Sequence, residues 1–416
     1  MAAVHVKLII IFLIIIFLIV SAPLSHSQQA PRSDDGMLTL PSAAGPTRDR
    51  TAAWRQLVQQ LLAEGRYREA LTPLGQAIRM DLTDAALYAA RGVVWKKLGQ
   101  YSLAVDDFER ALQFTDDQAP LYFQRGMTHY KMELYGPAER DFDLALLVQP
   151  QFAPAYFSRG VLLARSGRYA EAEDDFSHYA ALIPEGPRAW FRRGQMRTLL
   201  ENFADAVGDF DRVTEIEPEH AGVLAWRGYA LLRLGRHRAA ARDLERAIEL
   251  QPGDADLYLQ RGSAYFQGGR FSQAIDDMDS ALRLIPSDTR PYLVLGRAYA
   301  ALGLPERALA ALDQSIQRNP ESAIGYYTKG NVQYGQAQYA TALQNYSRAL
   351  ERDPGHFRAL INRGSAHYHL DRRGESCRDW RAACRLQAEQ GCRYVQTYCA
   401  EPGRVETPDA PNPAAP

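Results

Sequence analysis

The chain has 416 residues, of which 46% are hydrophobic and 10% aromatic, and its formal net charge is −1. This apolar content can build a folded core, which excludes a mostly disordered chain. The near-zero net charge excludes a protein whose overall charge alone selects its partner. All four cysteines lie in one short stretch, from Cys377 to Cys399.

The N-terminus has the pattern of a secretory signal peptide. Lys7 precedes an unbroken apolar run from Leu8 to Val20, and small residues flank a cleavage point before Gln28. This run is short for a membrane-spanning helix. We therefore predict a signal peptide over 1–27, export to the periplasm or cell envelope, and no stable membrane insertion after cleavage. The alternative is an anchor formed by an uncleaved N-terminal helix. Residues 28–50 have no helical period and are interpreted as a linker.

A sequence repeat of constant length fills the chain after this linker. The dipeptide Arg-Gly recurs at one fixed interval from Arg91 to Arg261, and again at Arg363, three intervals later. Gly296 and Gly330 continue the same phase. One interval is one repeat unit, and we number the positions of each unit from 1 to 34. Ten units follow one another without insertion, and they begin at Thr51, Ala85, Ala119, Ala153, Pro187, Ala221, Ala255, Thr289, Ala323 and Phe357.

Each unit has the pattern of two consecutive helices. Position 4 is aromatic in eight units, position 20 is Ala in nine, and position 24 is bulky in all ten. Positions 4, 8 and 11 share one helical face, and positions 20, 24 and 27 share another. Gly near position 15 and Pro at position 32 predict the ends of the two helices. Small residues at positions 8 and 20 predict that the paired helices approach closely.

This pattern resembles the tetratricopeptide repeat family, and the resemblance covers residues 51 to about 390. It implies an all-α fold, a right-handed α-solenoid of about ten helix hairpins, in which the first helices line a concave face that usually binds a partner. We expect ten tandem units over 51–390, a capping helix over 391–400 and a disordered, Pro-rich tail over 401–416. A bacterial protein fits the combination of signal peptide and repeats best.

Arginine and aspartate recur together in the repeat. Position 7 is Arg and position 23 is Asp in the same seven units, and units one and eight lack both. The ninth unit has Lys329 and Asn345, which we interpret as a weaker version of the pair. Joint presence predicts that the two side chains meet inside one unit, where a fork of Arg on carboxylate holds the helices in register. The alternative is a ladder of ligand-binding arginines.

The spacing of the cysteines predicts two disulfides. Cys377 and Cys384 are seven residues apart, as are Cys392 and Cys399. Seven helical residues rise about 10.5 Å, whereas a disulfide tolerates at most ~7 Å between Cα atoms. An antiparallel hairpin that turns near Ala388 brings together the nested pairs Cys377–Cys399 and Cys384–Cys392, which would staple the capping helix onto the last repeat. The alternative, a four-cysteine zinc site, needs all four sulfurs around one ion.

Motifs for catalysis or cofactor binding are missing from the sequence. It has no phosphate-binding loop, nucleophile elbow or dinucleotide fingerprint. His367 and His369 lie two residues apart and point to different helical faces, so they do not chelate one ion together. We expect a non-enzymatic protein with no metal site and no small-molecule cofactor.

In the family, partner contacts come mainly from positions 2, 5, 6, 9, 12 and 13 of each unit. Here these positions carry eleven basic residues, ten aromatic residues and one acidic residue, Asp256. The resemblance therefore implies a basic, aromatic concave groove. Its candidate residues are Phe123, Phe157, Phe191, Arg188, Arg192, Lys97, Lys131, Arg165, Arg233, Trp226 and Tyr229.

The chaperone-tail clamp known in this family is not expected. Arg188 and Arg192 match two of its places, but Phe123, Met127 and Ser158 stand where its other residues should be. We predict a scaffold that binds an acidic or partly apolar peptide segment in the groove. The alternatives are a binder of anionic envelope polymer or nucleic acid through the same groove, and a hydrolase whose residues match no known motif.

Overall fold

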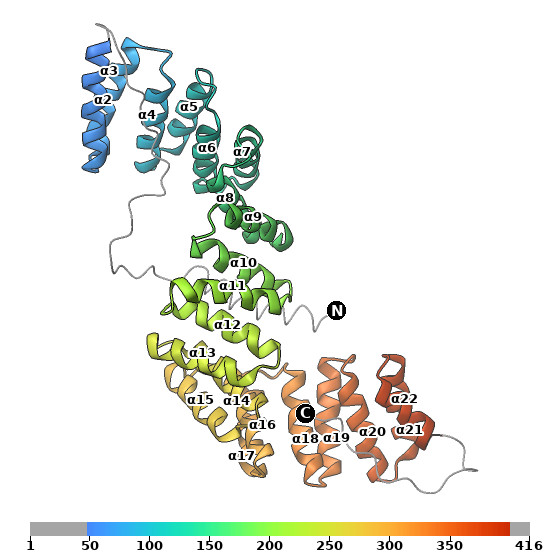
Figure 1. Cartoon of the computed structure of the whole chain (residues 1–416). Coiled ribbons are helices and arrows are strands. Elements are labelled where there is room, and N and C mark those ends of the chain that lie inside the picture. Colours follow the sequence, from blue (N-terminus) through green and yellow to red (C-terminus); the bar gives the residue numbers. More distant parts are fainter. Residues whose placement is uncertain (1–47, 400–416) are drawn as a thin grey trace. The chain divides into compact units, whose positions relative to one another are not determined.

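The computed structural model describes residues 48–399, with side chains from Gln56 onward. It contains 21 helices and no strand within that range (Figure 1). The expected signal peptide, linker and Pro-rich tail lie outside the described residues. None of the described helices is long and apolar enough to cross a membrane.

Consecutive helices pair into ten hairpins, and α22 (Glu389–Tyr398) follows the tenth. The first helices of hairpins one to ten are α2 (Arg48–Ala63), α4 (Ala85–Lys97), α6 (Ala119–Lys131), α8 (Ala153–Arg165), α10 (Pro187–Leu199), α12 (Ala221–Arg233), α14 (Ala255–Gln267), α16 (Arg290–Ala301), α18 (Ala323–Gly335) and α20 (Phe357–His369). The second helices are α3 (Tyr67–Met80), α5 (Tyr101–Leu112), α7 (Tyr135–Val148), α9 (Tyr169–Leu182), α11 (Phe203–Ile216), α13 (His237–Leu250), α15 (Phe271–Leu284), α17 (Pro305–Arg318), α19 (Tyr339–Arg352) and α21 (Arg373–Arg385). The all-α repeat fold expected from the sequence is therefore confirmed.

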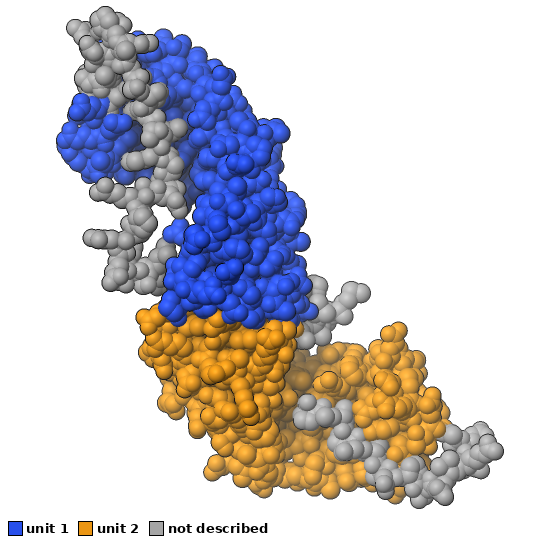
Figure 2. Space-filling view, in the orientation of Figure 1, with its two compact units in different colours: residues 1–218 blue, residues 219–416 orange. Residues whose placement is uncertain are grey.

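The chain divides into two compact units (Figure 2). The first unit ends at Pro218 and contains hairpins one to five, and the second begins at Glu219 and contains hairpins six to ten and α22.

The core of hairpins two to ten depends on a close contact between glycine at position 8 and a large side chain at position 24. In hairpin three, a Cβ atom at Gly126 would lie 2.9 Å from a ring carbon of Phe142, and in hairpin nine a Cβ at Gly330 would lie 2.6 Å from the ring of Tyr346. Real Cβ atoms essentially never show contacts under 3.0 Å. In these nine hairpins the glycine at position 8, predicted to allow close approach, faces the bulky residue of the second helix, and an added Cβ would displace that side chain. Hairpin one instead has Val58 at position 8.

The turns between the paired helices repeat one backbone conformation. Position 15 has a positive φ angle, which glycine adopts freely and other residues do not. Gly99, for example, holds this position with a φ of 76°. Glu133, Glu201, Ala337 and Asp371 occupy the same position with φ between 56° and 63°. The geometry of the repeat is thus kept at these four turns although the residue does not favour it.

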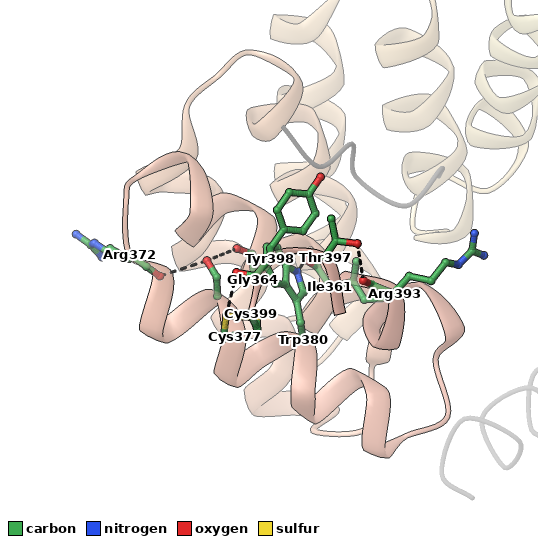
Figure 3. Close-up of a disulfide and its surroundings, with 10 residues drawn as sticks. Ile361, Gly364, Arg372, Cys377, Trp380, Arg393, Thr397, Tyr398 and Cys399 are labelled. Atoms are coloured by element: carbon green, nitrogen blue, oxygen red, sulfur yellow. Dashed lines mark hydrogen bonds between the residues drawn. A yellow bond between two sulfur atoms is a disulfide. The ribbon is translucent and has the colours of Figure 1, made fainter. Parts of the chain in front are cut away.

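The last hairpin is closed by α22 through two cysteine pairs. Cys377 on α21 bonds to Cys399, which follows α22, and their Cα atoms are 5.7 Å apart (Figure 3). Cys384 on α21 bonds to Cys392 on α22, with a Cα separation of 4.6 Å. These are the two nested pairs that the spacing predicts. The four sulfur atoms form two separate bonds, which is not the arrangement that a zinc site needs.

An aromatic cluster fills the space between α21 and α22. Trp380 is fully buried, and its indole Nε1 donates to the backbone carbonyl of Ile361 at 3.1 Å (Figure 3). The ring centroids of Tyr394 and Tyr398 lie 5.2 and 5.6 Å from that of Trp380. Tyr394 falls at position 4 in the repeat phase, so α22 packs as the first helix of a truncated eleventh repeat.

Candidate partner-binding face

Seven arginines at position 7 form the predicted forks with Asp at position 23 of their own hairpin. In hairpin two, Arg91 Nε donates to Asp107 Oδ2 and Arg91 Nη2 donates to Asp107 Oδ1, both at 2.7 Å. The other six pairs repeat this geometry, and they are Arg125–Asp141, Arg159–Asp175, Arg193–Asp209, Arg227–Asp243, Arg261–Asp277 and Arg363–Asp379. The prediction that the two side chains meet inside one unit is confirmed. These seven guanidinium groups are therefore already paired with carboxylates of the fold.

In some of these pairs the third nitrogen of the arginine, Nη1, contacts the preceding hairpin. Arg159 Nη1 donates to Asp143 at 2.6 Å, and Arg363 Nη1 donates to Ser347 Oγ at 3.1 Å. Asp143 and Ser347 both stand at position 25 of the preceding repeat. One arginine therefore joins the two helices of its own hairpin and also joins that hairpin to the one before it.

The interpretation of hairpin nine was wrong. Lys329 does not meet Asn345 but pairs with Asp313 of the preceding hairpin. Asn345 Nδ2 instead donates to Gln333 Oε1 at 2.7 Å. Lysine presents one terminal nitrogen rather than a planar fork, so it makes one of the two contacts that arginine makes together.

The face predicted to bind a partner lies on the opposite side of the first helices. Positions 2, 5, 6, 9, 12 and 13 share one arc of a helix, away from positions 4, 8 and 11, which pack inward. In the first unit, α4 contacts α6 and α6 contacts α8, so the first helices of hairpins two to four adjoin one another directly. Hairpin five packs on hairpin four through the contact of α10 with α9. We call the arc on hairpins two to five the first-unit face.

The three phenylalanines of the first-unit face are half-buried rather than free. The ring centroid of Phe123 lies 6.0 Å from that of Phe142, Phe157 lies 5.7 Å from Phe176, and Phe191 lies 6.2 Å from Phe210. Each phenylalanine at position 5 thus rests on the position-24 ring of its own hairpin. They form an apolar floor for the face, with part of each ring left exposed.

Basic side chains border this floor. Lys97, Lys131 and Arg165 are the last residues of α4, α6 and α8, and all three are exposed. The guanidinium carbon of Arg165 lies 5.0 Å from the ring centroid of Tyr135, a cation–π contact that orients this side chain. A positive side chain thus ends the first helix in three consecutive hairpins.

Hairpin five contributes two further arginines near the start of α10. Arg188 is exposed. Arg192 is half-buried, and its Nη1 donates to Gln195 Oε1 at 3.1 Å. Burial lowers the pKa of Arg192, because desolvation disfavours the charged form. No carboxylate pairs with Arg192 within residues 56–399, so its charge is not neutralised there.

The second unit differs from the predicted groove in two respects. Trp226 is only 8% exposed and belongs to the packed interior, so its assignment to an open face is corrected. Arg290 pairs with Asp256 at 2.7 Å and with Asp288 at 2.7 Å, so it adds little free positive charge. Tyr229 and Arg233 remain together, with Arg233 Nη1 donating to the Tyr229 hydroxyl at 3.0 Å.

Two kinds of comparison relate the sequence to known proteins. A family model described as "Tetratricopeptide repeat" matches residues 55–120, 123–187, 227–289 and 327–376. A second model with the same description matches residues 265–327. No curated protein gave a significant match.

Several solved structures share helical repeats with this chain. A tetratricopeptide repeat protein from Parabacteroides merdae is 17% identical over 60% of this chain and 98% of its own, with a TM-score of 0.43. Yeast Tom70 is 12% identical over 85% and 96%, with a TM-score of 0.45. Pseudomonas aeruginosa pilF is 20% identical over 54% and 99%, with a TM-score of 0.44.

The family assignment rests on the sequence matches and on the helical hairpins together. The family models cover more than half of the chain, and the matched segments fall in both compact units. The described helices pair into hairpins with the same period as the sequence repeat. This chain therefore belongs to the tetratricopeptide repeat family.

Proposed function

We propose that this protein is an exported scaffold of the periplasm or cell envelope, which binds an acidic, partly apolar peptide segment on its first-unit face. One observation carries the proposal. The face positions of hairpins two to five hold six basic residues and no acidic residue, in a chain whose net charge is −1. The six are Lys96, Lys97, Lys131, Arg165, Arg188 and Arg192.

The coarse part of this function follows from the family. Tetratricopeptide repeat proteins generally act as protein–protein interaction scaffolds, and the fold is typically non-catalytic. The finer part, an acidic partner, rests on charge. A surface with one sign of charge raises the local concentration of an oppositely charged segment and speeds its association.

Helix stability explains only part of this charge pattern. A cation at a helix C-terminus stabilises the helix by about 0.3–1 kcal/mol, which is sufficient reason for Lys97, Lys131 and Arg165. Arg188 is the second residue of α10, where a positive charge opposes the helix dipole. Arg192 is in addition half-buried without a carboxylate. These two arginines therefore favour a role in binding an anionic partner.

The half-exposed phenylalanines suit a partner that also carries apolar side chains. Phe123, Phe157 and Phe191 occur once in each of three consecutive hairpins. An extended segment that passes along the face would meet one of these rings and one or two cations in each of hairpins three to five. Partial ring exposure supports shallow apolar contacts, while the cations supply specificity for acidic residues.

Export is supported by the N-terminal sequence pattern and by the cysteines. Two bonded cysteine pairs suit an oxidising compartment, where disulfides persist. The first check is therefore to express the full chain in a bacterial host with a periplasm and determine the N-terminal residue of the exported product. A product that begins at Gln28 agrees with export, and an uncleaved product retained in the membrane fraction indicates the anchored alternative.

The binding proposal is tested with the protein of residues 28–416 as bait in envelope extract. We expect it to retain a protein partner, and we expect Arg188→Glu with Arg192→Glu to weaken binding at least tenfold without changing the melting temperature. Binding should also fall as salt rises. The matched control is Arg110→Glu with Arg140→Glu, which makes the same charge change on exposed residues of second helices.

Three outcomes distinguish the alternatives. Equal binding by the Arg188/Arg192 variant, together with no dependence on salt, contradicts the basic face. Equal loss in the control variant means that net charge, not the face, determines binding. Retention of a protease-resistant anionic polymer, in place of a protein, supports the polymer alternative.

A further inference from the structure

A hollow in the second unit lies at the turn between α12 and α13. Its volume is about 480 Å³, and three arginines line it, Arg236, Arg238 and Arg242. His237 and Gly268, the residue after α14, also line it. All of these residues belong to the same compact unit.

The three arginines have no ion pair within the described part of the chain. In hairpins one and four the arginine at position 16 is neutralised from position 19, whereas Arg270 of hairpin seven has Gln273 at that position. Arg66 pairs with Glu69 at 2.5 Å, and Arg168 pairs with Glu171 at 2.6 Å. In hairpin six, position 19 is Ala239, so the acidic partner of Arg236 is missing.

This concentration of charge does not come from the repeat pattern. No other hairpin has arginine at all three of positions 16, 18 and 22. Position 17 is Tyr or Phe in seven hairpins and is His237 in this one. The Nδ1 atom of His237 is buried with no hydrogen-bond partner among the described residues. The three arginines are therefore the charged groups that line the hollow, and His237 lies beside them.

Helix stability disfavours this arrangement. The cluster surrounds the N-terminus of α13, whose first turn has no acidic residue. Positive charges there oppose the helix dipole, and Arg238 and Arg242 repel each other because they lie four residues apart on one helical face. The backbone N–H groups of Ala239 and Ala240 both donate to the carbonyl of Arg236. The N–H groups of His237 and Arg238, the first two residues of α13, have no carbonyl acceptor within the helix.

We propose that this hollow binds a phosphate group, as free phosphate, as a soluble phosphate ester or as a phospholipid headgroup. Guanidinium groups bind phosphate oxygens through paired N–H donors, and a helix N-terminus offers further backbone donors to the same anion. A bound phosphate relieves the repulsion among the three arginines.

The test measures binding of inorganic phosphate and glycerol 3-phosphate to the purified full chain by calorimetry, at fixed ionic strength set with chloride. Binding to vesicles of phosphatidylcholine with phosphatidylglycerol is measured in parallel. We expect saturable binding of at least one phosphate probe and a tenfold or greater loss in Arg238→Gln with Arg242→Gln. Arg238→Lys with Arg242→Lys should retain more binding than the Gln variant.

The matched control is Arg68→Gln with Arg140→Gln, which removes arginines from the same two repeat positions in hairpins one and three. Phosphate binding should be unchanged there. Binding of glycerol 3-phosphate without vesicle binding identifies a soluble ester, and vesicle binding lost in the Gln variant identifies a headgroup. The proposal is overturned if no probe binds above chloride, or if the Gln variant binds as well as wild type. It is also overturned if the control variant loses binding equally.

Discussion

Hairpins seven and eight are neighbours in the second unit but are held together differently. In hairpin seven, Arg261 and Asp277 form the fork between α14 and α15, with donor–acceptor distances of 2.9 and 2.6 Å. In hairpin eight, Leu295 and Ala311 occupy the same two positions and are buried, with exposures of 4% and 8%. Both hairpins form with the same helix lengths to within one residue. The fork is therefore not required to build a hairpin.

What both hairpins share is the contact between glycine at position 8 and a large side chain at position 24. Gly262 faces Met278, and Gly296 faces Leu312. Packing brings the two helices together, and the fork then fixes them where polar residues stand at positions 7 and 23. A buried ion pair of this kind gives little net stability over an apolar pair of similar fit, but it becomes costly when one partner is lost.

The largest expected effect comes from breaking one half of the fork. Asp277→Ala should destabilise the protein by about 3 kcal/mol, because Arg261 is left without its carboxylate in a mostly buried site. Arg261→Leu with Asp277→Ala, which copies the residues of hairpin eight, should cost less than half as much. Urea unfolding measures the total, and hydrogen exchange in α14 and α15 locates the loss. A double variant as unstable as the single one contradicts the comparison.

The second prediction tests whether the glycine contact at position 8 contributes equally to stability in hairpins with and without an Arg–Asp fork. Gly330 is in hairpin nine, which has no fork, and Gly364 is in hairpin ten, which has one. An added Cβ would lie 2.6 Å from the Tyr346 ring in the first case and 2.5 Å from Trp380 Nε1 in the second. We expect Gly330→Ala and Gly364→Ala to cost about 2 kcal/mol each, measured by urea unfolding.

A control for these glycine variants lies in the same helix as Gly330. A Cβ at Gly335, the last residue of α18, meets no atom within 4 Å. Gly335→Ala should therefore be neutral or slightly stabilising. If Gly330→Ala is also neutral, the helices of hairpin nine are less tightly packed than the contact distances indicate.

The smallest effect concerns the turns, which are common to both kinds of hairpin. Ala337 in hairpin nine and Glu201 in hairpin five have φ angles of 58° and 63°. Replacing either by glycine should stabilise the protein by about 0.5–1 kcal/mol, since relief of the left-handed strain exceeds the added entropy of the unfolded chain. Thermal unfolding checks both. Gly303→Ala, at φ of 71°, is the reverse control and should destabilise.

The sequence predicted the features that depend on spacing. The period, the Arg–Asp partners and the cysteine pairs each follow from residue numbers and helix geometry, because a helix fixes which side chains share a face. Sequence did not predict how deeply a residue on that face is buried. Phe123 and Trp226 both occupy face positions, yet one is half-buried and the other belongs to the interior.

Partner choice among several candidates was also beyond the sequence. Lys329 has an acceptor in its own hairpin, Asn345, and one in the preceding hairpin, Asp313. Only the structure shows that it pairs with Asp313. The arginine-lined hollow was missed for a different reason, because its residues lie outside the face positions. Comparing repeats at positions 16 to 19 and 22 would have found it, since Ala239 replaces the acidic residue that accompanies Arg66 and Arg168.

The stapled cap makes the two ends of the repeat array unequal in the order in which they come apart. Terminal repeats have neighbours on one side only and separate first when a solenoid unfolds. With both disulfides formed, α22 remains tied to α21 even when its hydrogen bonds open. We therefore expect α22 to stay attached to hairpin ten during partial unfolding, whereas hairpin one can open without such a link. Reduction of the two disulfides should remove this difference between the two ends.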